Sequence, residues 1–434
     1  YQAIDVAIAR GLTHVEAGAQ GEHKLMRGYS PVATWSAHYI PDPGFRRAVA
    51  DFLVRERADV AQPQVEALPG DRMDAVAGIA DQHQPRVGDA RRMVEAERIA
   101  RPRRQPVEPA EHAAQYQQIA GNIAGIAQTL GTVNTESVLD DMVSRSLVAV
   151  PTTWWSGFAF DENDSGIVLE TGYSYCTEAI VGLDWFAENK SAPATVQAVG
   201  YPGDYGGDSA EGVRRWAEVN GATALDAIGT GPNQVVGNQD QVVAAVLAGS
   251  PDVVVLAIGP AETAEIVGKL AASGFQGRFL GALPTWNGAL LQSAAAPALT
   301  AMYNHLTPYQ NWDGTSAGMD AIKESLGGTP PTNAGYLIGW TIGYPFKAAI
   351  EAAAAAGDLT PEGLRAVVDG LEVDFEGLAP AHVYGGDPQE QAQQTANVGE
   401  PSADVELGLK TIASDYAGST FDKTDYSAAC AATS

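Results

Sequence analysis

DVVVLAIGPAETAEIVGKLAASGFQGRFLG, residues 252–281, is the stretch that decides the fold class. Its two apolar runs, VVVLAI and RFLG, have the length and composition of strands that are buried on both faces. The part between them starts at a proline, carries apolar residues at helical spacing and ends at a glycine, as helices commonly do. A strand, a helix and a strand in this order predict a unit with two parallel strands.

The same alternation continues over the chain from residue 119 onward. Amphipathic segments separate short apolar runs, which are GIAQTL, LVAVP, ATVQAVGY, ATALDAIG, DVVVLAIG and GRFLGAL. We therefore expect parallel sheets covered by helices on both faces, which is the α/β class. A chain of 434 residues is too long for one core of ordinary size, so it predicts two domains or one domain with two lobes.

Composition and charge exclude several classes of partner. The formal net charge of −27 argues against nucleic acid or an anionic membrane surface, because both need a basic face on the protein. No apolar run approaches the ~20 residues that a membrane-spanning helix needs. We therefore expect a globular protein that does not insert into a membrane.

The sequence gives little support to a catalytic function, because it lacks the enzyme motifs considered below. The chain contains no GxxxxGK[ST] phosphate loop and no HExxH zinc motif, and the glycines of residues 200–208 are not in GxGxxG register. After residue 118 the only histidines are His305 and His382, and neither has a Cys or a carboxylate pair at ligand spacing. The sequence therefore predicts no catalytic residues, no metal and no cofactor.

Polar and aromatic residues gather directly after the predicted strands. Ligands of parallel α/β sheets bind at the carboxyl ends of the strands. Five such ends carry hydroxyls, aromatic rings and one carboxylate, at residues 131–135, 151–155, 202–208, 260–265 and 284–287. This inventory suits a small molecule with an anionic end, a cationic end and an apolar middle.

The ordered set of these motifs resembles a known family. QTLGT (128–132), PTTWW (151–155), GYPGDYGGD (200–208), the stretch 251–281 and TNAGYLIGWTIGYPFKAAIEAA (332–353) are similar to the solute-binding proteins of ABC importers for branched-chain amino acids. These proteins have the periplasmic binding protein type I fold. The resemblance covers about residues 119–415.

The resemblance implies two Rossmann-like lobes, each with a parallel central sheet, joined by a three-strand hinge. The chain would cross between the lobes near residues 172, 286 and 372. The N-terminal lobe would then hold residues 1–172 and 286–371, and the C-terminal lobe residues 173–285 and 372–434.

The resemblance also implies a set of ligand-binding residues. The first lobe would hold the ligand's carboxylate, and the second lobe would close over it with a tyrosine and an acid that takes the ammonium group. Trp286, near the expected second crossing, would line either the pocket or the hinge. The matching positions are Gly131, Thr132, Thr152, Thr153 and Trp154 in the first lobe, and Tyr205 and Glu262 in the second.

The function implied is the capture of a small polar or zwitterionic ligand, such as an amino acid, an amide or an aromatic acid, for delivery to an ABC permease. Hinge closure would bury the ligand, and no chemical step is involved. The protein would lie outside the cytoplasm, either in the periplasm or anchored to the cell surface as a lipoprotein. The alternative is a ligand-sensing domain of a receptor or of an amide-responsive regulator.

Two adjacent tryptophans mark a departure from the amino-acid binders. Successive side chains of an extended segment point to opposite sides, so we expect Trp154 to face the ligand and Trp155 to pack away from it. Amino-acid binders commonly have small residues and a threonine where this chain has Trp154. The indole would shrink the pocket or stack on a planar ligand, so the resemblance does not carry the branched-chain specificity over to this chain.

Residues 1–118 lack the opening motifs of the family and differ in composition. They hold 15 of the 26 Lys and Arg residues but only 16 of the 53 Asp and Glu residues. Three explanations compete: a divergent lobe, a different appended region, or a stretch translated in the wrong reading frame. The Arg, Ala and Pro-rich composition favours the wrong frame.

The two cysteines, Cys176 and Cys430, are either unrelated thiols or one disulfide. In an exported protein we favour the disulfide, which would tie the C-terminal tail to the predicted helix at residues 177–189.

Overall fold

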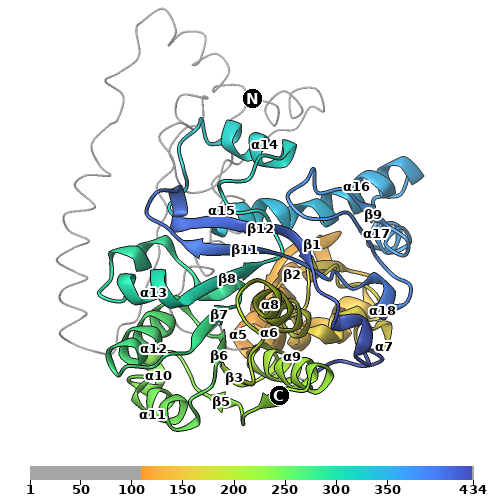
Figure 1. The fold of residues 1–434 in the computed structure, drawn as a ribbon. Helices are drawn as coiled ribbons and strands as arrows, with labels where there is room; N and C mark the ends of the chain where they lie inside the picture. Colours follow the sequence, from red (N-terminus) through yellow and green to blue (C-terminus); the bar gives the residue numbers. More distant parts are fainter. Residues whose placement is uncertain (1–108, 433–434) are drawn as a thin grey trace, which may run out of the picture. The chain divides into compact units, whose positions relative to one another are not determined.

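The computed structural model describes residues 109–432, and a mixed eight-stranded sheet is the largest element in this part of the chain (Figure 1). Its strand order is β12-β11-β8-β7-β6-β3-β4, with β5 also paired to β3. All pairs between β3 and β8 are parallel, and β11 and β12 add an antiparallel edge. The strands are β3 (Thr195–Gly200), β4 (Thr223–Ala224), β5 (Ile228–Gly229), β6 (Val253–Ala257), β7 (Arg278–Gly281), β8 (Tyr303–Thr307), β11 (Thr395–Pro401) and β12 (Leu409–Ala417).

The stretch 252–281 forms the predicted parallel unit. β6 is followed by α12 (Pro260–Ala272) and then by β7, and Val254 of β6 lies opposite Phe279 of β7 in a parallel ladder. Every residue of β6 is buried, as expected for a strand that is covered on both faces. The predicted α/β class is confirmed.

Alternate residues of the large sheet face two layers of helices. Val253 and Val255 pack against α8 (Tyr175–Asn189) and α9 (Asp204–Asn220). Val254 and Leu256 pack against the other layer, which consists of α11 (Asp240–Gly249), α12 and α13 (Ala296–Met302). The two-residue period of a strand thus divides the core of this sheet into two clusters.

A second, smaller sheet has two parallel strands, β1 (Gly125–Leu130) and β2 (Val148–Thr152). Val168 extends it by a bridge to Ala149. One face packs on α6 (Thr132–Ser144), and the other packs on α16 (Gly343–Ala356) and α17 (Pro361–Arg365). An antiparallel pair, β9 (Glu372–Val373) with β10 (His382–Val383), packs against the same cluster as α16.

The remaining elements are short or peripheral. They are the helices α5 (Pro109–Ile119), α7 (Asp161–Asp164), α10 (Asn233–Val236), α14 (Ala317–Ser325), α15 (Gly335–Thr341) and α18 (Pro388–Gln391), and the 3-10 turns η2 (Ala120–Asn122), η3 (Ser156–Ala159), η4 (Leu283–Thr285), η5 (Gly288–Gln292), η6 (Glu406–Gly408) and η7 (Phe421–Lys423). We call β1, β2, β9, β10, α6 and α14 to α17 the small-sheet group. The large-sheet group comprises β3 to β8, β11, β12, α8, α9 and α11 to α13.

The position of β8 contradicts the expected boundary between the two lobes at residue 286. This strand pairs with β7 in the large sheet, so the chain stays in the large-sheet group until Thr307. Likewise β9 and β10, which follow the expected crossing at residue 372, pack with the small-sheet group, and the chain returns to the large sheet only at β11. The sequence YNHLT of β8 lacks the β-branched run that marked the other strands, so the expected crossing was placed one strand too early.

A disulfide joins Cys176 of α8 to Cys430, with 6.3 Å between the two Cα atoms. The tail is also held by hydrogen bonds, since Asp208 of α9 accepts from the Ala431 N–H (3.0 Å) and Asp184 of α8 accepts from the Ser419 and Thr420 N–H groups (2.8 Å each). These contacts hold the tail as far as Ala431 against α8 and α9.

The described residues 109–432 lie within one compact unit, so α5 belongs with the groups described above. The expectations about residues 1–108 lie outside the described residues. Within residues 109–432, no helix has both the length and the apolar character needed to cross a membrane.

Candidate functional site

A cavity of about 510 Å³ opens at the carboxyl ends of the parallel strands of both sheets. Residues that follow β1, β2, β3, β6, β7 and β8 line it together with residues of α15. Of the predicted ligand-binding residues, the lining contains Gly131, Thr132, Thr152, Thr153, Trp154, Tyr205 and Trp286. That these side chains bind a ligand stays a prediction, but the structure brings seven of the eight to one cavity.

The start of α6 presents Gly131 and Thr132 to the cavity. Gly131 precedes the helix with φ +87°, a conformation that side chains with a Cβ rarely adopt. The first amides of a helix have no partner within it, which favours an acceptor group at this position.

Thr132 is already engaged by the large-sheet group. Its Oγ1 donates to Oδ2 of Asp204, the first residue of α9, and lies 2.8 Å from Thr153 Oγ1. Since the one proton of Thr132 goes to the carboxylate, Thr153 is the donor to Thr132. Burial raises the pKa of Asp204, and the Thr132 hydrogen bond partly opposes that rise. Of the two hydroxyls expected to bind a ligand's carboxylate, Thr132 therefore bonds to a carboxylate of the protein and Thr153 bonds to Thr132.

Trp154 and Trp155 point to different places. Trp154 lines the cavity, and its Nε1 donates to the Thr171 carbonyl (2.5 Å) and contacts Tyr309 Oη (3.2 Å). Trp155 packs on Phe158 in the cluster behind β2, and its Nε1 donates to the Ala431 carbonyl (2.8 Å). Both are 5% exposed, so burial alone does not distinguish them.

Glu262 does not line the cavity, contrary to the expected contact with a ligand ammonium group. It is 4% exposed and accepts hydrogen bonds from Tyr201 Oη (2.9 Å) and the Asn233 N–H (2.8 Å). Tyr201 lines the cavity, so Glu262 lies behind that ring. The resemblance placed Glu262 at the correct strand end, but Tyr201 and Asn233 already use its carboxylate oxygens.

Tyr205 and Trp286 lie on the large-sheet side of the cavity. The Tyr205 ring lies 4.4 Å from the Tyr175 ring, and its hydroxyl donates to the Ile258 carbonyl (3.2 Å). Trp286 stacks on Tyr303 with 5.7 Å between ring centroids and donates to the Leu407 carbonyl (3.1 Å). Trp286 therefore belongs to the wall of the cavity and to the large-sheet group.

Three buried polar atoms of the lining have no hydrogen-bond partner among the described residues: Thr152 Oγ1, His305 Nδ1 and Gln310 Oε1. His305 is 3% exposed, and burial lowers its pKa to about 4, so the ring is neutral near pH 7. Its Nε2 lies 3.1 Å from the Leu283 carbonyl, which can only accept, so Nε2 carries the proton. His305 Nδ1 is therefore a hydrogen-bond acceptor without a donor among the described residues.

The sequence analysis missed His305, Gln310, Asp204 and Tyr309 as lining residues. Three of them lie on or just after β8, and that strand was not recognised. Asp204 is part of the quoted GYPGDYGGD motif, where only the neighbouring tyrosine was selected.

A hydrolase-type GxSxG spacing occurs in GTSAG, residues 314–318. Its Ser316 is the N-cap of α14, and the serine hydroxyl accepts from the Met319 N–H (3.1 Å). The preceding strand ends at Thr307, so the strand-turn-helix context of a nucleophile elbow is missing here. Within the described residues, no group of three or more His, Cys, Asp or Glu side chains could hold a metal ion.

Glu178 connects α8 to the cavity wall from behind. It is 2% exposed and accepts from the Leu283 N–H (2.9 Å) and from Tyr173 Oη (3.1 Å) through the same oxygen. Burial raises its pKa to about 8, and these two hydrogen bonds partly oppose the rise.

Glu178→Gln is expected to flatten the dependence of stability on pH. The folded state keeps the Glu178 proton up to about pH 8, whereas the unfolded chain releases it near its ordinary pKa of 4.5. This contribution is complete below pH 4.5 and is lost as the pH rises to 8, by up to ~1.4 kcal/mol per pH unit. Urea unfolding from pH 5 to pH 8.5 measures it. The exposed Glu324→Gln variant should keep the wild-type slope, and an unchanged slope in Glu178→Gln contradicts the assignment.

Comparison with family models decides the family. Residues 106–405, more than two thirds of the chain, match the model described as periplasmic binding protein. The chain belongs to this family. The match begins at residue 106, so the part of the chain that resembles the family starts earlier than the expected residue 119.

Solved structures share the fold of this periplasmic binding protein. A fatty acid ABC transporter substrate-binding protein from Thermomonospora curvata is 20% identical, with a TM-score of 0.67 over 78% of this chain and 90% of that one. A branched chain amino acid ABC transporter protein from Thermus thermophilus with bound valine is 16% identical, with a TM-score of 0.60 over 73% and 84%. A solute binding protein from R. palustris in complex with benzoate is 13% identical, with a TM-score of 0.56 over 72% and 83%. The fold is therefore that of the type I periplasmic binding proteins.

A second family model, FemAB-like, described as peptidoglycan biosynthesis/recognition, matches residues 1–69 of the binding protein. No curated protein sequence matches the chain at a significant level.

Proposed function

We propose that this binding protein captures a small solute in the 510 Å³ cavity and delivers it to an ABC permease outside the cytoplasm. The observation that carries the proposal is that both sheets contribute strand ends to the cavity wall. The family and the named functions of the similar structures support it. No chemical step is needed, because the energy for delivery comes from binding and from the importer.

The small-sheet and large-sheet groups act as the two lobes of the proposed mechanism. The chain passes between them around residues 171–175, 308–316 and 384–394, and a solute would be enclosed when these segments bend. The Thr132 to Asp204 hydrogen bond joins the groups across the cavity. A solute that contacts both groups adds to this link and favours the closed state.

The lining favours a solute with an aromatic or aliphatic body and an N–H head group. Seven Trp and Tyr rings line the cavity, and among its described lining residues there is no Lys or Arg. The unpartnered His305 Nδ1 needs a donor, and the Asp204 carboxyl is also part of the lining. An amine or an amide supplies a donor to these groups, whereas a bare carboxylate meets no cation and finds Thr132, at the start of α6, already bonded to Asp204.

Three ligands that share a phenyl ring test this ranking. Phenethylamine and phenylacetamide are expected to raise the melting temperature of the full chain, and phenylacetate is expected to have little effect. A ligand at a hundred times its Kd stabilises the folded state by ~2.7 kcal/mol, which a thermal-shift assay detects. Asp204→Asn should weaken phenethylamine about tenfold and leave phenylacetamide nearly unchanged, because only the amine carries a charge. Stabilisation by phenylacetate alone contradicts the ranking, and no shift with this panel, amino acids or other amides contradicts solute capture.

We infer that residues 1–69 are an appended region. A stretch translated in the wrong frame is not expected to match a protein family, and the FemAB-like match covers this segment. The match favours the appended region over the wrong frame and over a divergent lobe. The disulfide between Cys176 and Cys430 supports an oxidising location, in the periplasm or at the cell surface as a lipoprotein.

A further inference from the structure

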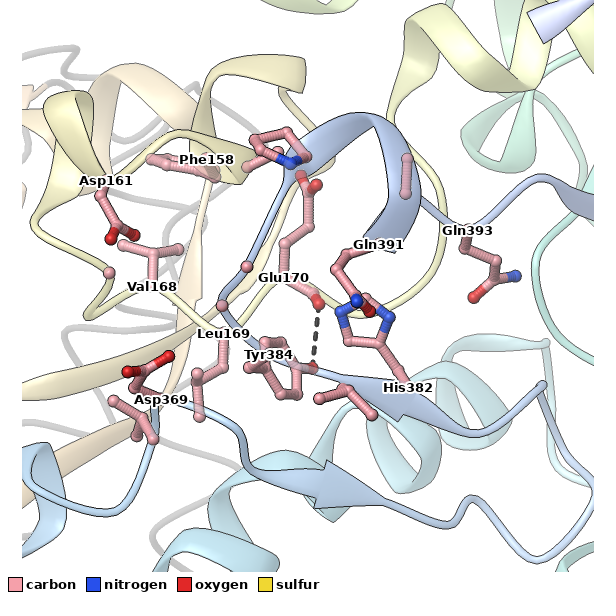
Figure 2. A pocket seen from close by; sticks show the side chains of 18 of the residues that line it. Phe158, Asp161, Val168, Leu169, Glu170, Asp369, His382, Tyr384, Gln391 and Gln393 are labelled. Carbon is pink, nitrogen blue, oxygen red and sulfur yellow. Dashed lines mark hydrogen bonds between the residues drawn. The ribbon is translucent and has the colours of Figure 1, made fainter. Parts of the chain in front are cut away.

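A second cavity, of about 160 Å³, shares no lining residue with the solute cavity (Figure 2). It lies between the segment that leads from η3 to α8 and the segment that runs from β10 through α18. Its volume is below the ~300 Å³ at which pockets for drug-sized ligands begin, so an occupant has few heavy atoms.

The side chain of Glu170 lies among the residues that line this cavity. Its main-chain carbonyl accepts from Tyr384 Oη (2.9 Å), as the dashed line in Figure 2 shows. Its carboxyl Oε1 is buried and has no hydrogen-bond partner among the described residues. Burial raises the pKa of this carboxyl well above its usual range, and the charges of Asp208, Asp164 and Asp204 add to the rise. A buried carboxyl oxygen without a partner is costly, so the site favours an occupant that supplies a donor to Oε1.

None of the other described titratable groups of this cavity serves as a cation partner for Glu170. His382 lines it, but burial lowers its pKa to about 4, so the imidazole is neutral near pH 7. Arg365 donates to the Ser165 carbonyl. The exposed carboxylates Asp161 and Asp369 lie to one side of Glu170 in Figure 2.

Aromatic side chains supply the rest of a cation site. The rings of Phe158, Tyr384 and Tyr426 line the cavity. Aromatic faces attract cations and also cover short alkyl groups. We propose that this cavity binds a small alkylammonium ion, with its ammonium group on Glu170 and its alkyl chain against these rings.

The proposed cation site lies where the chain passes between the two groups. Glu170 precedes Thr171, whose carbonyl accepts from Trp154 and Tyr309 of the solute cavity. Gln393 lies in the third segment that connects the two groups, residues 384–394. It donates to the carbonyl of Pro308 (3.4 Å), which begins the second connecting segment, residues 308–316. The cation site goes beyond solute capture, and each is tested with its own ligand.

Calorimetric titration of the full chain with propylammonium chloride at pH 7, in the presence of saturating phenylacetamide to occupy the solute cavity, tests the proposal. We expect a Kd on the order of 1 mM for so small a ligand. The ammonium group favours the ionised carboxyl, so binding should release close to one proton from Glu170, measured as a dependence of the heat on the ionisation enthalpy of the buffer. Glu170→Gln keeps the shape of the side chain but should weaken binding at least tenfold and abolish the proton release.

The controls separate this site from its surroundings. Asp369→Asn on the rim and Glu324→Gln, which lies outside both cavities, should bind propylammonium like the wild type. Propanol, which has no charge, should not bind. The proposal is overturned if the wild type does not bind propylammonium, if Glu170→Gln binds it equally, or if propanol binds as well. Proton release by the wild type is decisive even if Glu170→Gln does not fold, since its absence also overturns the proposal.

Discussion

Removal of the Cys176–Cys430 disulfide is expected to lower the free energy of unfolding by up to about 5 kcal/mol and the melting temperature by roughly 10 °C. The bond closes a loop with a sequence separation of 254 residues, so it restricts the unfolded chain over most of the described region. Cys176 is fully buried in the first turn of α8, and Ala fits at that place without new contacts. The double variant Cys176→Ala, Cys430→Ala therefore removes the bond with little change in packing.

Urea and thermal unfolding of the double variant measure this effect. Reduced wild-type protein should match the double variant, and dithiothreitol should leave the variant unchanged. The hydrogen bonds from Ala431 to Asp208 and from Thr420 to Asp184 remain, so we expect the folded variant to keep its tail in place and its solute affinity. Equal unfolding midpoints for the oxidised wild type and the double variant would show that the bond adds no stability.

Trp154→Ala is expected to weaken solute binding by tenfold or more, whereas Trp155→Ala is expected to leave it within about twofold. Both variants should lose ~3–5 kcal/mol of stability, since each removes a large buried ring. Only the Trp154 ring lines the cavity, and its contacts with Tyr175 and Tyr309 position two further lining rings. Trp155 instead contacts Phe158, away from the solute.

The comparison of the two tryptophan variants separates binding from stability. Affinity is measured by calorimetry with whichever phenyl ligand of the panel binds most tightly, at a temperature where both variants are folded. Trp154→Phe and Trp155→Phe repeat the test with smaller losses of packing. If both alanine variants lose affinity in proportion to their stability, the Trp154 contact with the solute is refuted.

The local sequence pattern was sufficient to predict the fold where a strand is a clear apolar run and the following helix has clear start and end residues. The unit β6, α12 and β7 follows directly from the runs VVVLAI and RFLG and from the proline and glycine that bound the helix. β8 was missed because its residues, Tyr303–Thr307, are buried by their neighbours and not by an apolar composition. The error at β8 moved the expected crossing and left His305 and Tyr309 out of the predicted site.

The sequence predicted which strand ends line the candidate site, but not which of their side-chain atoms are free to contact a ligand. Gly131, Thr153 and Trp154 lie at one cavity because the carboxyl ends of parallel strands share an edge of a sheet. Glu262 also follows a strand, yet Tyr201 and Asn233 satisfy its carboxylate and keep it out of the lining.

The order of apolar runs and helix ends along the chain determined the α/β class, the strand ends that line the cavity and the two cysteines available for a bond. Only the tertiary structure decided which polar groups are already satisfied. Thr132 meets the carboxylate of Asp204, 72 residues further along the chain, and the imidazole of His305 meets the Leu283 carbonyl but leaves Nδ1 without a partner. The physical reason is that secondary structure follows from local periodicity, whereas hydrogen-bond satisfaction depends on atoms that distant parts of the chain bring together.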